Sequence, residues 1–316
     1  MKLRVALLGA GNVTRAFLTY WNQRNFGIEL RVVSVLRQRG VWHGDAPSTV
    51  DPDGLQYKPE LDAFNGAQLA IEALPSVYPH GEPATSLLKS ALDRKIDVLT
   101  VDKGPLVAAY RQLADAASRS GARLKFCVGG ALPAVDVVMR DLRGTTIRKV
   151  RAILNGTTNF ILSEMDRRGC SLREALDVAI DRGIAEPDPS QDINGVDTAA
   201  KMIILVNATL GQNIRLEHVR IRGIHDVDLE TARRANSVWK LVGTFEDGKI
   251  RVEPELIPTD DVFAKVGGTD KIAEFDSVEM GKLAVLGGAS GRMQMGATMT
   301  KEILNLYLDT ASQTAP

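Results

Sequence analysis

The strongest constraint on the fold is the start of the chain, where a buried strand, two glycines and a helix follow one another. An apolar run at residues 3–8 leads into Gly-Ala-Gly-Asn-Val at 9–13, and an amphipathic stretch continues to residue 24. Glycines at such a turn let the backbone approach a pyrophosphate, and the helix N-terminus offers free N–H groups. Thr14 replaces the third glycine of G-x-G-x-x-G, but both phosphate-side glycines remain. The sequence therefore predicts a dinucleotide-binding turn at Gly9, Gly11, Asn12 and Val13, with an ordinary strand–helix turn as the alternative.

The first 125 or so residues alternate short apolar runs with amphipathic stretches, which is typical of a parallel sheet covered by helices. We predict strands at 3–8, 30–36, 69–73, 97–101 and 124–128, and helices at 13–24, 82–94 and 106–120. Residues 38–65 are polar and rich in Pro, Gly and Asp, so they are expected to form a long loop or a degraded helix.

A different pattern follows residue 147, with strands expected at 150–154, 220–225 and 249–256. Helices are expected at 161–167, 172–182, 197–210 and 296–308, and the proline-rich acidic segment 185–195 is expected to be neither helix nor strand. The predicted fold class is α/β: an N-terminal Rossmann domain with a parallel sheet, followed by a second α+β domain with a mixed sheet.

The end of the second strand usually contacts the adenosine ribose, where an acidic residue binds the 2′-hydroxyl and an arginine accommodates a 2′-phosphate. This chain has Val-Leu-Arg-Gln-Arg at 35–39 and no carboxylate there. We predict NADP over NAD, with Arg37 as the better phosphate ligand and Arg39 as the second. Two solvated loop arginines are the alternative. Ser76 and Lys103 are also assigned to the cofactor site.

Four later segments, at 100–105, 154–159, 185–195 and 197–201, are unusual for a plain scaffold. Asp197 and Lys201 lie four apart on one helical face, which by itself fits a surface ion pair. However, Lys201 shares its face with Ile204, Leu205 and Ala208, so we expect it near the core boundary with an anionic partner.

Together and in this order, these segments resemble homoserine dehydrogenase over nearly the whole chain, most specifically at 155–159 and 186–201. The resemblance implies reversible NAD(P)-linked interconversion of L-homoserine and L-aspartate 4-semialdehyde by a homodimer. It also implies a Rossmann domain at 1–130 completed by a C-terminal helix at 296–316, and a catalytic and dimerisation domain at 131–295. Many members carry an ACT or aspartate kinase domain; this chain is expected to be a short form without either.

The resemblance also assigns residues. It implies that Lys103 and Lys201 are the active-site lysines and that Asp197 is the carboxylate beside them. We expect the two lysines to share proton exchange with the substrate oxygen, with Asp197 orienting Lys201. It implies substrate contacts at Glu186, Asp192 and a turn at Gly156 and Thr157. Gly288, Ala289 and Ser290 resemble a Gly-Ala-Gly near the nicotinamide, so the first two are expected to contact the cofactor.

Three residues depart from the family pattern. Asp102 stands where the family usually has Asn, and Ile184 replaces a tyrosine that borders the substrate, which makes the substrate pocket more apolar. Lys125 replaces a glutamate that in many members binds a monovalent cation near Val128 and Gly130, so we predict no metal site. These changes leave a paralogue that uses another small hydroxy or amino acid as one alternative function, and a non-catalytic NADP-sensing protein as another.

Charge and cysteine content exclude other classes of function. Lys plus Arg and Asp plus Glu each number 39, a balance that attracts neither nucleic acid nor an anionic membrane. The two cysteines, Cys127 and Cys170, form no disulfide framework or zinc pattern, and no hydrolase nucleophile motif is present. No signal segment or long apolar run is recognised, so we expect a cytoplasmic enzyme whose partner is a small-molecule substrate.

Overall fold

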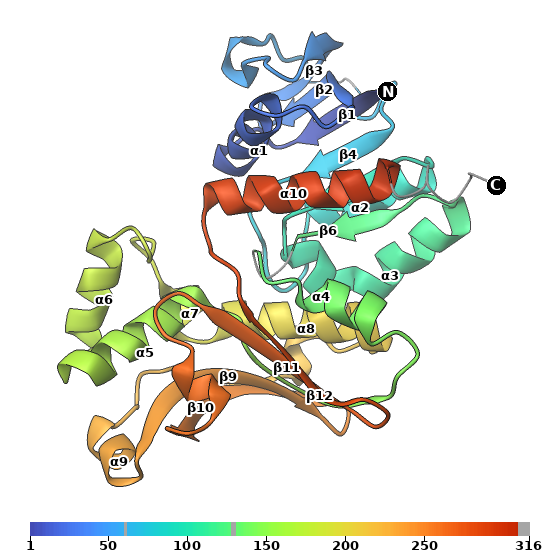
Figure 1. The fold of residues 1–316 in the computed structure, drawn as a ribbon. Coiled ribbons are helices and arrows are strands. Elements are labelled where there is room, and N and C mark those ends of the chain that lie inside the picture. The colour runs from blue at the N-terminus through green and yellow to red at the C-terminus, as the bar shows by residue number, and fades with distance from the viewer. Residues whose placement is uncertain (60–61, 128–130, 309–316) are drawn as a thin grey trace. The chain divides into compact units, whose positions relative to one another are not determined.

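The computed structural model describes residues 1–59, 62–127 and 131–308. These residues form two compact units (Figure 1). The first unit comprises the described residues up to 127 together with 291–308, and the second comprises residues 131–290. Within the described ranges, no helix is long and apolar enough to cross a membrane.

The first unit is built on a six-stranded sheet in the order β3-β2-β1-β4-β5-β6 (Figure 1). The predicted Rossmann-type arrangement is confirmed, because the five strands of the expected alternation run parallel. They are β1 (Lys2–Leu8), β2 (Glu29–Arg37), β4 (Leu69–Glu72), β5 (Asp97–Thr100) and β6 (Leu124–Phe126). The last two residues of the predicted strand 124–128 are Cys127, which follows β6, and Val128, which lies outside the described residues.

One strand of this sheet was not predicted. Residues 38–65, expected to be loop or degraded helix, contain β3 (Gly40–Pro47), which pairs antiparallel with β2, and a short 3-10 turn, η1 (Pro52–Gly54). The sheet is therefore mixed and not purely parallel. The sequence of β3 is rich in Gly, Asp and Pro and has weak strand propensity, but the open edge of β2 supplies its hydrogen-bond partners, and tertiary pairing overrides propensity.

Helices α1 (Asn12–Asn22) and α10 (Arg292–Tyr307) pack together against β1. Phe17 and Trp21 of α1 and Ile303 of α10 share one buried core with Leu3 and Leu7. At Gly296 the two helices approach so closely that a Cβ would lie 3.1 Å from the Ala16 carbonyl oxygen. Residues far apart in the chain thus form one core. Helices α2 (Ala84–Asp93) and α3 (Gly104–Ser120) pack against each other, and residues 309–316 of the predicted terminal segment lie outside the described residues.

The second unit contains a mixed sheet in the order β12-β11-β7-β9-β10-β8. Its strands are β7 (Ile147–Ile153), β8 (Arg220–Ile221), β9 (Ser237–Glu246), β10 (Lys249–Pro258), β11 (Lys271–Ser277) and β12 (Gly281–Gly287). The sequence analysis missed β9, β11 and β12, and β8 is much shorter than the predicted 220–225. Asp247 and Gly248, both with positive φ (49° and 73°), form the turn between β9 and β10, and this Asp-Gly pair was a usable hairpin signal.

Helix α8 (Val196–Leu210) packs on one face of this sheet, where Gly243 leaves room for the Met202 side chain. Residues 185–195 contain a short helix that was predicted to be absent, α7 (Ser190–Ile193), which begins immediately after Pro189. The other helical elements of the unit are α4 (Ala134–Asp136), η2 (Val137–Asp141), α5 (Gly156–Arg168), α6 (Leu172–Asp181), η3 (Leu216–His218), α9 (Leu229–Arg234) and η4 (Val262–Lys265).

Candidate functional site

The glycine turn has the geometry expected of a dinucleotide site. Gly9 has a φ of 95°, and a Cβ there would lie 2.7 Å from the Ala73 carbonyl oxygen, so the position requires glycine. Gly11 caps α1, with no atom within 4 Å of its would-be Cβ, which leaves space for a ligand's phosphate. Thr14, which replaces the third glycine, is buried and its hydroxyl donates to the Gly9 carbonyl (2.9 Å). The threonine at this position therefore stabilises the turn through this hydrogen bond.

Two buried carboxyl groups lie at the ends of β4 and β5. Glu72 is fully buried; its carboxylate accepts from the Thr100 hydroxyl and from the Leu74 N–H (2.6 Å). Burial, with a contribution from the negative charge of Asp102, raises the pKa of Glu72 to about 7. Burial also raises the pKa of Asp102. Asp102 accepts from the Gly104 N–H (2.7 Å), so this departure from the family pattern supports the first turn of α3.

Lys103 and Ser76 meet at the same edge of the sheet. Lys103 is the N-cap residue of α3, and its backbone N–H donates to the Ser76 hydroxyl oxygen (3.2 Å). Parallel α/β sheets bind ligands outside the carboxyl ends of their strands, which is where β5 delivers these two residues.

A carboxylate that was not expected from the sequence lies beside the end of β2. A cavity of about 460 Å³ is lined by Arg37, Gln38, Arg39, Asp53, Leu55 and Tyr57. Asp53, from η1, pairs with Arg37 (2.6 Å) and with Arg15 of α1 (2.6 Å). The ion pair with Arg37 lowers the pKa of the Asp53 carboxyl. Arg37 and Arg39 thus line one cavity, and an acidic residue reaches it from 16 positions beyond Arg37.

In the second unit, Lys201 and Asp197 of α8 form the expected pair. Their Nζ–Oδ2 distance is 2.6 Å, and their side chains are only 15% and 13% exposed. Lys201 also donates to the carbonyl oxygen of Leu154 at the end of β7 (2.9 Å). The prediction of a core-boundary lysine with an anionic partner is confirmed. Low exposure strengthens the Coulombic attraction between the two charges relative to a solvated i,i+4 pair.

Asn155 links this pair to the acidic segment. Its side-chain amide donates to Asp192 (2.5 Å) and to Asp197 (2.8 Å), while its side-chain oxygen accepts from the Thr158 N–H and caps α5. Burial is the main cause that raises the pKa of Asp192, followed by the charge of Asp197; the charge of the exposed Glu186 also contributes. Asn155 belongs to segment 154–159, which was singled out from the sequence, but no role was predicted for this residue.

Gly156 and Thr157, expected in a turn, are the first two residues of α5. The Thr157 hydroxyl donates to the carbonyl oxygen of Ile184 (3.2 Å), so the residue that departs from the family lies beside this helix start. A Cβ on Gly156 would lie 2.8 Å from the Thr269 carbonyl oxygen, which explains why glycine is required there.

The segment expected near the nicotinamide begins at the end of β12. Gly288 has a φ of 80°, and a Cβ there would lie 2.6 Å from the Leu132 N atom. Its carbonyl oxygen accepts a hydrogen bond from Lys271 (2.6 Å), a buried residue that the sequence analysis missed. Ala289 and Ser290 follow Gly288 as an irregular segment.

The structure therefore gathers the predicted residues in two groups, one in each unit. Ser76 and Lys103 meet in the first, and Asp192, Asp197 and Lys201 meet in the second through Asn155. Among the described residues, no group of three His, Cys, Asp or Glu side chains is suited to hold a metal ion. Lys125 pairs with Glu302 (3.7 Å), whereas Val128 and Gly130, named for the cation, lie outside the described residues.

The sequence of this chain is similar to those of known homoserine dehydrogenases. The family model of homoserine dehydrogenase matches residues 133–304. A homoserine dehydrogenase of Methanocaldococcus jannaschii is 36% identical over 77% of this chain and 74% of its own length. An NAD(+)-dependent homoserine dehydrogenase of Pseudomonas canavaninivorans is 30% identical over 96% of both chains.

Solved structures show the same likeness. The crystal structure of a putative homoserine dehydrogenase from Archaeoglobus fulgidus has a TM-score of 0.86 and 28% identity, covering 96% of this chain and 99% of that one. A hyperthermophilic archaeal homoserine dehydrogenase mutant in complex with NADPH has a TM-score of 0.83 and 26% identity, covering 98% of both chains.

Proposed function

This chain belongs to the homoserine dehydrogenase family of NAD(P)-dependent oxidoreductases, and from that premise we propose that it interconverts L-homoserine and L-aspartate 4-semialdehyde. The observation that carries the proposal is the Lys201–Asp197 pair. This amine is largely shielded from water, fixed by a carboxylate and by the Leu154 carbonyl, and joined through Asn155 to an acidic segment suited to the substrate's amino group. A protein that only senses a nucleotide needs none of these groups.

We assign cofactor binding to the first unit, because its glycine turn fits a pyrophosphate. The backbone at Gly9 and Gly11 and the N-terminus of α1 would hold the phosphates, and Ser76 and the Lys103 turn lie at the same edge of the sheet. A bound nicotinamide nucleotide supplies the hydride donor or acceptor. One relative is named for NAD(+) and a structural neighbour contains NADPH, so the family supports either cofactor.

We assign substrate binding and proton transfer mainly to the second unit. Glu186 and Asp192 supply negative charge for the substrate's ammonium group, and the Asn155 amide fixes Asp192 and Asp197 relative to each other. Lys201 exchanges a proton with the hydroxyl oxygen of homoserine, and Asp197 holds the Lys201 amine in place. Lys103 is proposed as the second amine of the same reaction, and Gly288 and Ala289 as contacts of the nicotinamide side of the cofactor.

A steady-state screen tests this function. L-homoserine and related small hydroxy and amino acids are offered with NADP and with NAD, and nicotinamide reduction is followed by absorbance. We expect L-homoserine to give the highest kcat/KM by at least about tenfold, because the polar groups around Asp192 discriminate by whole hydrogen bonds. A better alternative substrate would identify a paralogue, whereas tight cofactor binding without turnover would identify a sensor.

We propose NADP as the preferred cofactor, on the basis of Arg37 and Arg39 in the cavity at the end of β2. Asp53 limits this preference, since its carboxylate forms an ion pair with the Arg37 guanidinium and would repel a 2′-phosphate. An Asp53→Asn variant is expected to raise the ratio of kcat/KM for NADP over NAD about tenfold, whereas Arg37→Ala is expected to lower it. If both ratios equal that of the unmodified protein, the cavity does not bind the cofactor's ribose.

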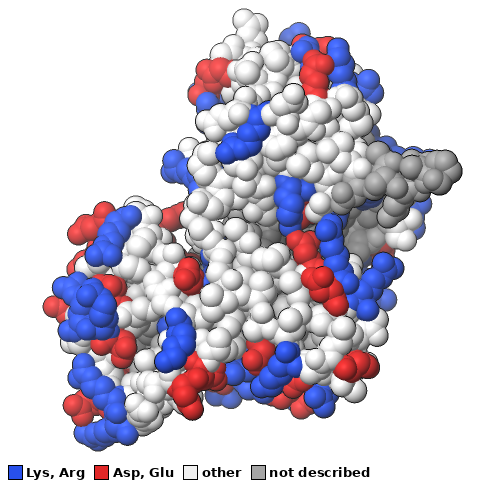
Figure 2. Space-filling model, in the orientation of Figure 1, with Lys and Arg blue, Asp and Glu red and all other residues white. Residues whose placement is uncertain are grey.

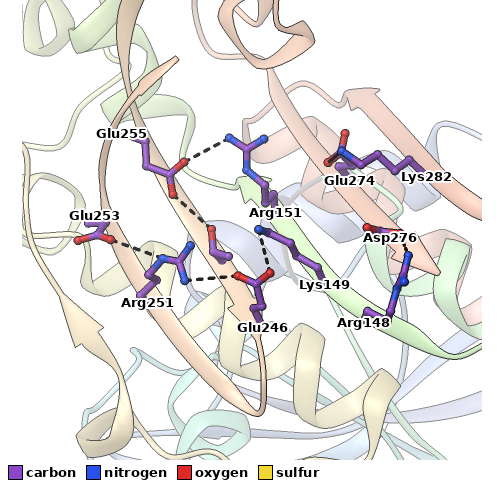
Figure 3. Close-up of polar contacts among 11 residues, drawn as sticks. Arg148, Lys149, Arg151, Glu246, Arg251, Glu253, Glu255, Glu274, Asp276 and Lys282 are labelled. Carbon is purple, nitrogen blue, oxygen red and sulfur yellow. Dashed lines mark hydrogen bonds and ion pairs between the residues drawn. The ribbon is translucent and has the colours of Figure 1, made fainter. Parts of the chain in front are cut away.

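We propose a homodimer formed through the face of the second sheet opposite α8. Figure 3 shows that this face contains interleaved ion pairs, including Lys149–Glu246, Arg151–Glu255, Arg251–Glu253 and Lys282–Glu274. Several of these charges are well shielded; the Glu274 side chain is 14% exposed. A face with both signs interspersed is complementary to a two-fold related copy of itself.

An Ala284→Arg variant tests that interface. Ala284 is exposed on β12 directly opposite Glu274 of β11, so an arginine fits the single chain but obstructs a second copy. Sedimentation velocity is expected to show the unmodified protein at twice the mass of one chain and the variant at a single mass. A dimeric Ala284→Arg variant would exclude this face as the interface.

We propose the cytoplasm as the compartment and a small molecule as the partner. Neither Cys127 nor Cys170 forms a disulfide with another described residue, which fits a reducing environment. Figure 2 shows acidic and basic side chains interspersed on the visible face, which fits the proposed absence of nucleic-acid and membrane partners.

A further inference from the structure

Lys271 is a buried lysine that the proposed reaction does not use. It is the first residue of β11, pairs in register with Gly287 of β12, and is only 1% exposed. Its ammonium donates to the Gly288 carbonyl oxygen (2.6 Å), at the start of the segment assigned to the nicotinamide side. An ammonium in the core is unfavourable, so its presence beside an active site calls for a functional reason.

The charged groups around Lys271 are those of the proton-transfer site. The charges that act on it come from Lys201 and Asp197 of α8 and from Asp270, which precedes β11. Burial is the main cause that lowers the pKa of Lys271 to about 8, and the positive charge of Lys201 lowers it further. Electrostatic interaction is mutual, so the two ammonium groups repel each other.

The structure also ties Lys271 to the substrate side of the site. The turn before β11 carries Thr269, whose carbonyl oxygen lies against Gly156 at the start of α5. The same turn is held by the Asn159 side chain, whose amide donates to the Asp270 carbonyl (3.1 Å). Lys271 therefore connects three parts of one site: the start of α5, the Lys201–Asp197 pair and the Gly288 turn.

We propose that Lys271 is a positioning residue of the reaction, which fixes the Gly288 turn and, by its positive charge, helps Lys201 to accept the substrate's proton. The inference rests on the proposed function. Loss of the charge removes the repulsion, so homoserine oxidation should then require a higher pH. Loss of the hydrogen bond to Gly288 should instead weaken the cofactor interaction, because the turn is no longer held.

Two substitutions separate these effects, and the chain offers a matched control. Lys271→Met removes both the charge and the donor, whereas Lys271→Gln removes the charge but keeps an N–H donor. Lys240 is also buried (3% exposed), and burial likewise lowers its pKa to about 8. Its ammonium donates to Asn159 and to the Val266 carbonyl, and the charge that acts on it is that of Asp166. Lys240→Met is therefore the control for removing a buried lysine and a contact of Asn159 while the charge of Lys271 is kept.

The readout is the pH dependence of kcat for L-homoserine oxidation. Both Lys271 variants are expected to shift the acidic limb upward by about one pH unit, which is about a tenfold slower rate below it. Only Lys271→Met should also raise the KM for the cofactor. Lys240→Met should keep the profile of the unmodified protein. Active Lys271 variants with an unshifted profile would overturn the proposal, whereas absence of turnover in the unmodified protein would refute the proposed function itself.

A second readout requires no turnover. Because the pKa of Lys271 is about 8 when folded and 10.5 by its ordinary value, the unfolded chain holds more protons between these pH values. Stability of the unmodified protein should therefore rise with pH across that window relative to Lys271→Met, as measured by urea unfolding without cofactor. Equal slopes of the unfolding free energy against pH would show that folding does not lower the pKa of Lys271, which would contradict the proposed role.

Discussion

A Lys201→Met variant is expected to lose about 10²–10⁴-fold in kcat while it keeps its fold and its affinity for the cofactor. The variant retains most of the length of the side chain but has no group that exchanges a proton with the substrate oxygen. Lys201 belongs to the second unit and the glycine turn to the first, so cofactor binding should change by less than about twofold. The measurement is the rate of NADPH oxidation on mixing with L-aspartate 4-semialdehyde.

Lys149→Met is the matched control for this experiment. Lys149 belongs to the same unit and also forms an ion pair, with Glu246 (3.0 Å), but it lies on the sheet face opposite α8. Its loss should leave kcat within about twofold of the unmodified protein, because a partly exposed ion pair contributes little. A Lys201→Met variant as active as this control would exclude Lys201 from proton transfer.

The glycine turn provides the second large effect, with different outcomes at its two glycines. Gly9→Ala forces a Cβ against the Ala73 carbonyl oxygen at a positive φ, at a cost of about 1–3 kcal/mol. Both the melting temperature and the affinity for NADP should fall. Gly11→Ala meets no protein atom within 4 Å, so the melting temperature should hardly change, but cofactor affinity should fall at least about tenfold because the methyl group occupies the phosphate space.

Thermal unfolding without cofactor, followed by titration with NADPH, separates the two variants. If Gly11→Ala binds NADPH as tightly as the unmodified protein, the turn does not contact the phosphates. If Gly9→Ala melts at the same temperature as the unmodified protein, the close approach of this turn to β4 does not constrain the fold.

Local patterns predicted much of the fold but not the elements that depend on long-range pairing. The alternation of apolar runs and amphipathic stretches identified five strands of the first sheet, because each buried parallel strand is a compact apolar run. Strand β3 was missed since its residues are half exposed and polar, and only pairing with β2 makes it a strand. Strand β12 was missed for a related reason, as an edge strand whose residues are mostly exposed.

The candidate site shows the same division. The Lys201–Asp197 pair was predictable, because residues four apart share one face of a helix. The contacts of Asn155 with Asp192 and of Lys271 with Gly288 cross 37 and 17 residues of sequence, and no spacing rule indicates them. Likewise, the carboxylate beside Arg37 belongs to Asp53, beyond a strand that the sequence did not reveal. Residues that act through tertiary contacts become visible only in the folded chain.

The central proposal is that Lys103 and Lys201 serve the same proton-transfer step. A double-mutant cycle in kcat for Lys103→Met and Lys201→Met tests this claim most directly, because groups that serve one step are strongly non-additive. The kcat of the double variant is expected to be about that of the slower of the two single variants. Losses that multiply would show that the two lysines act independently and would contradict a shared step.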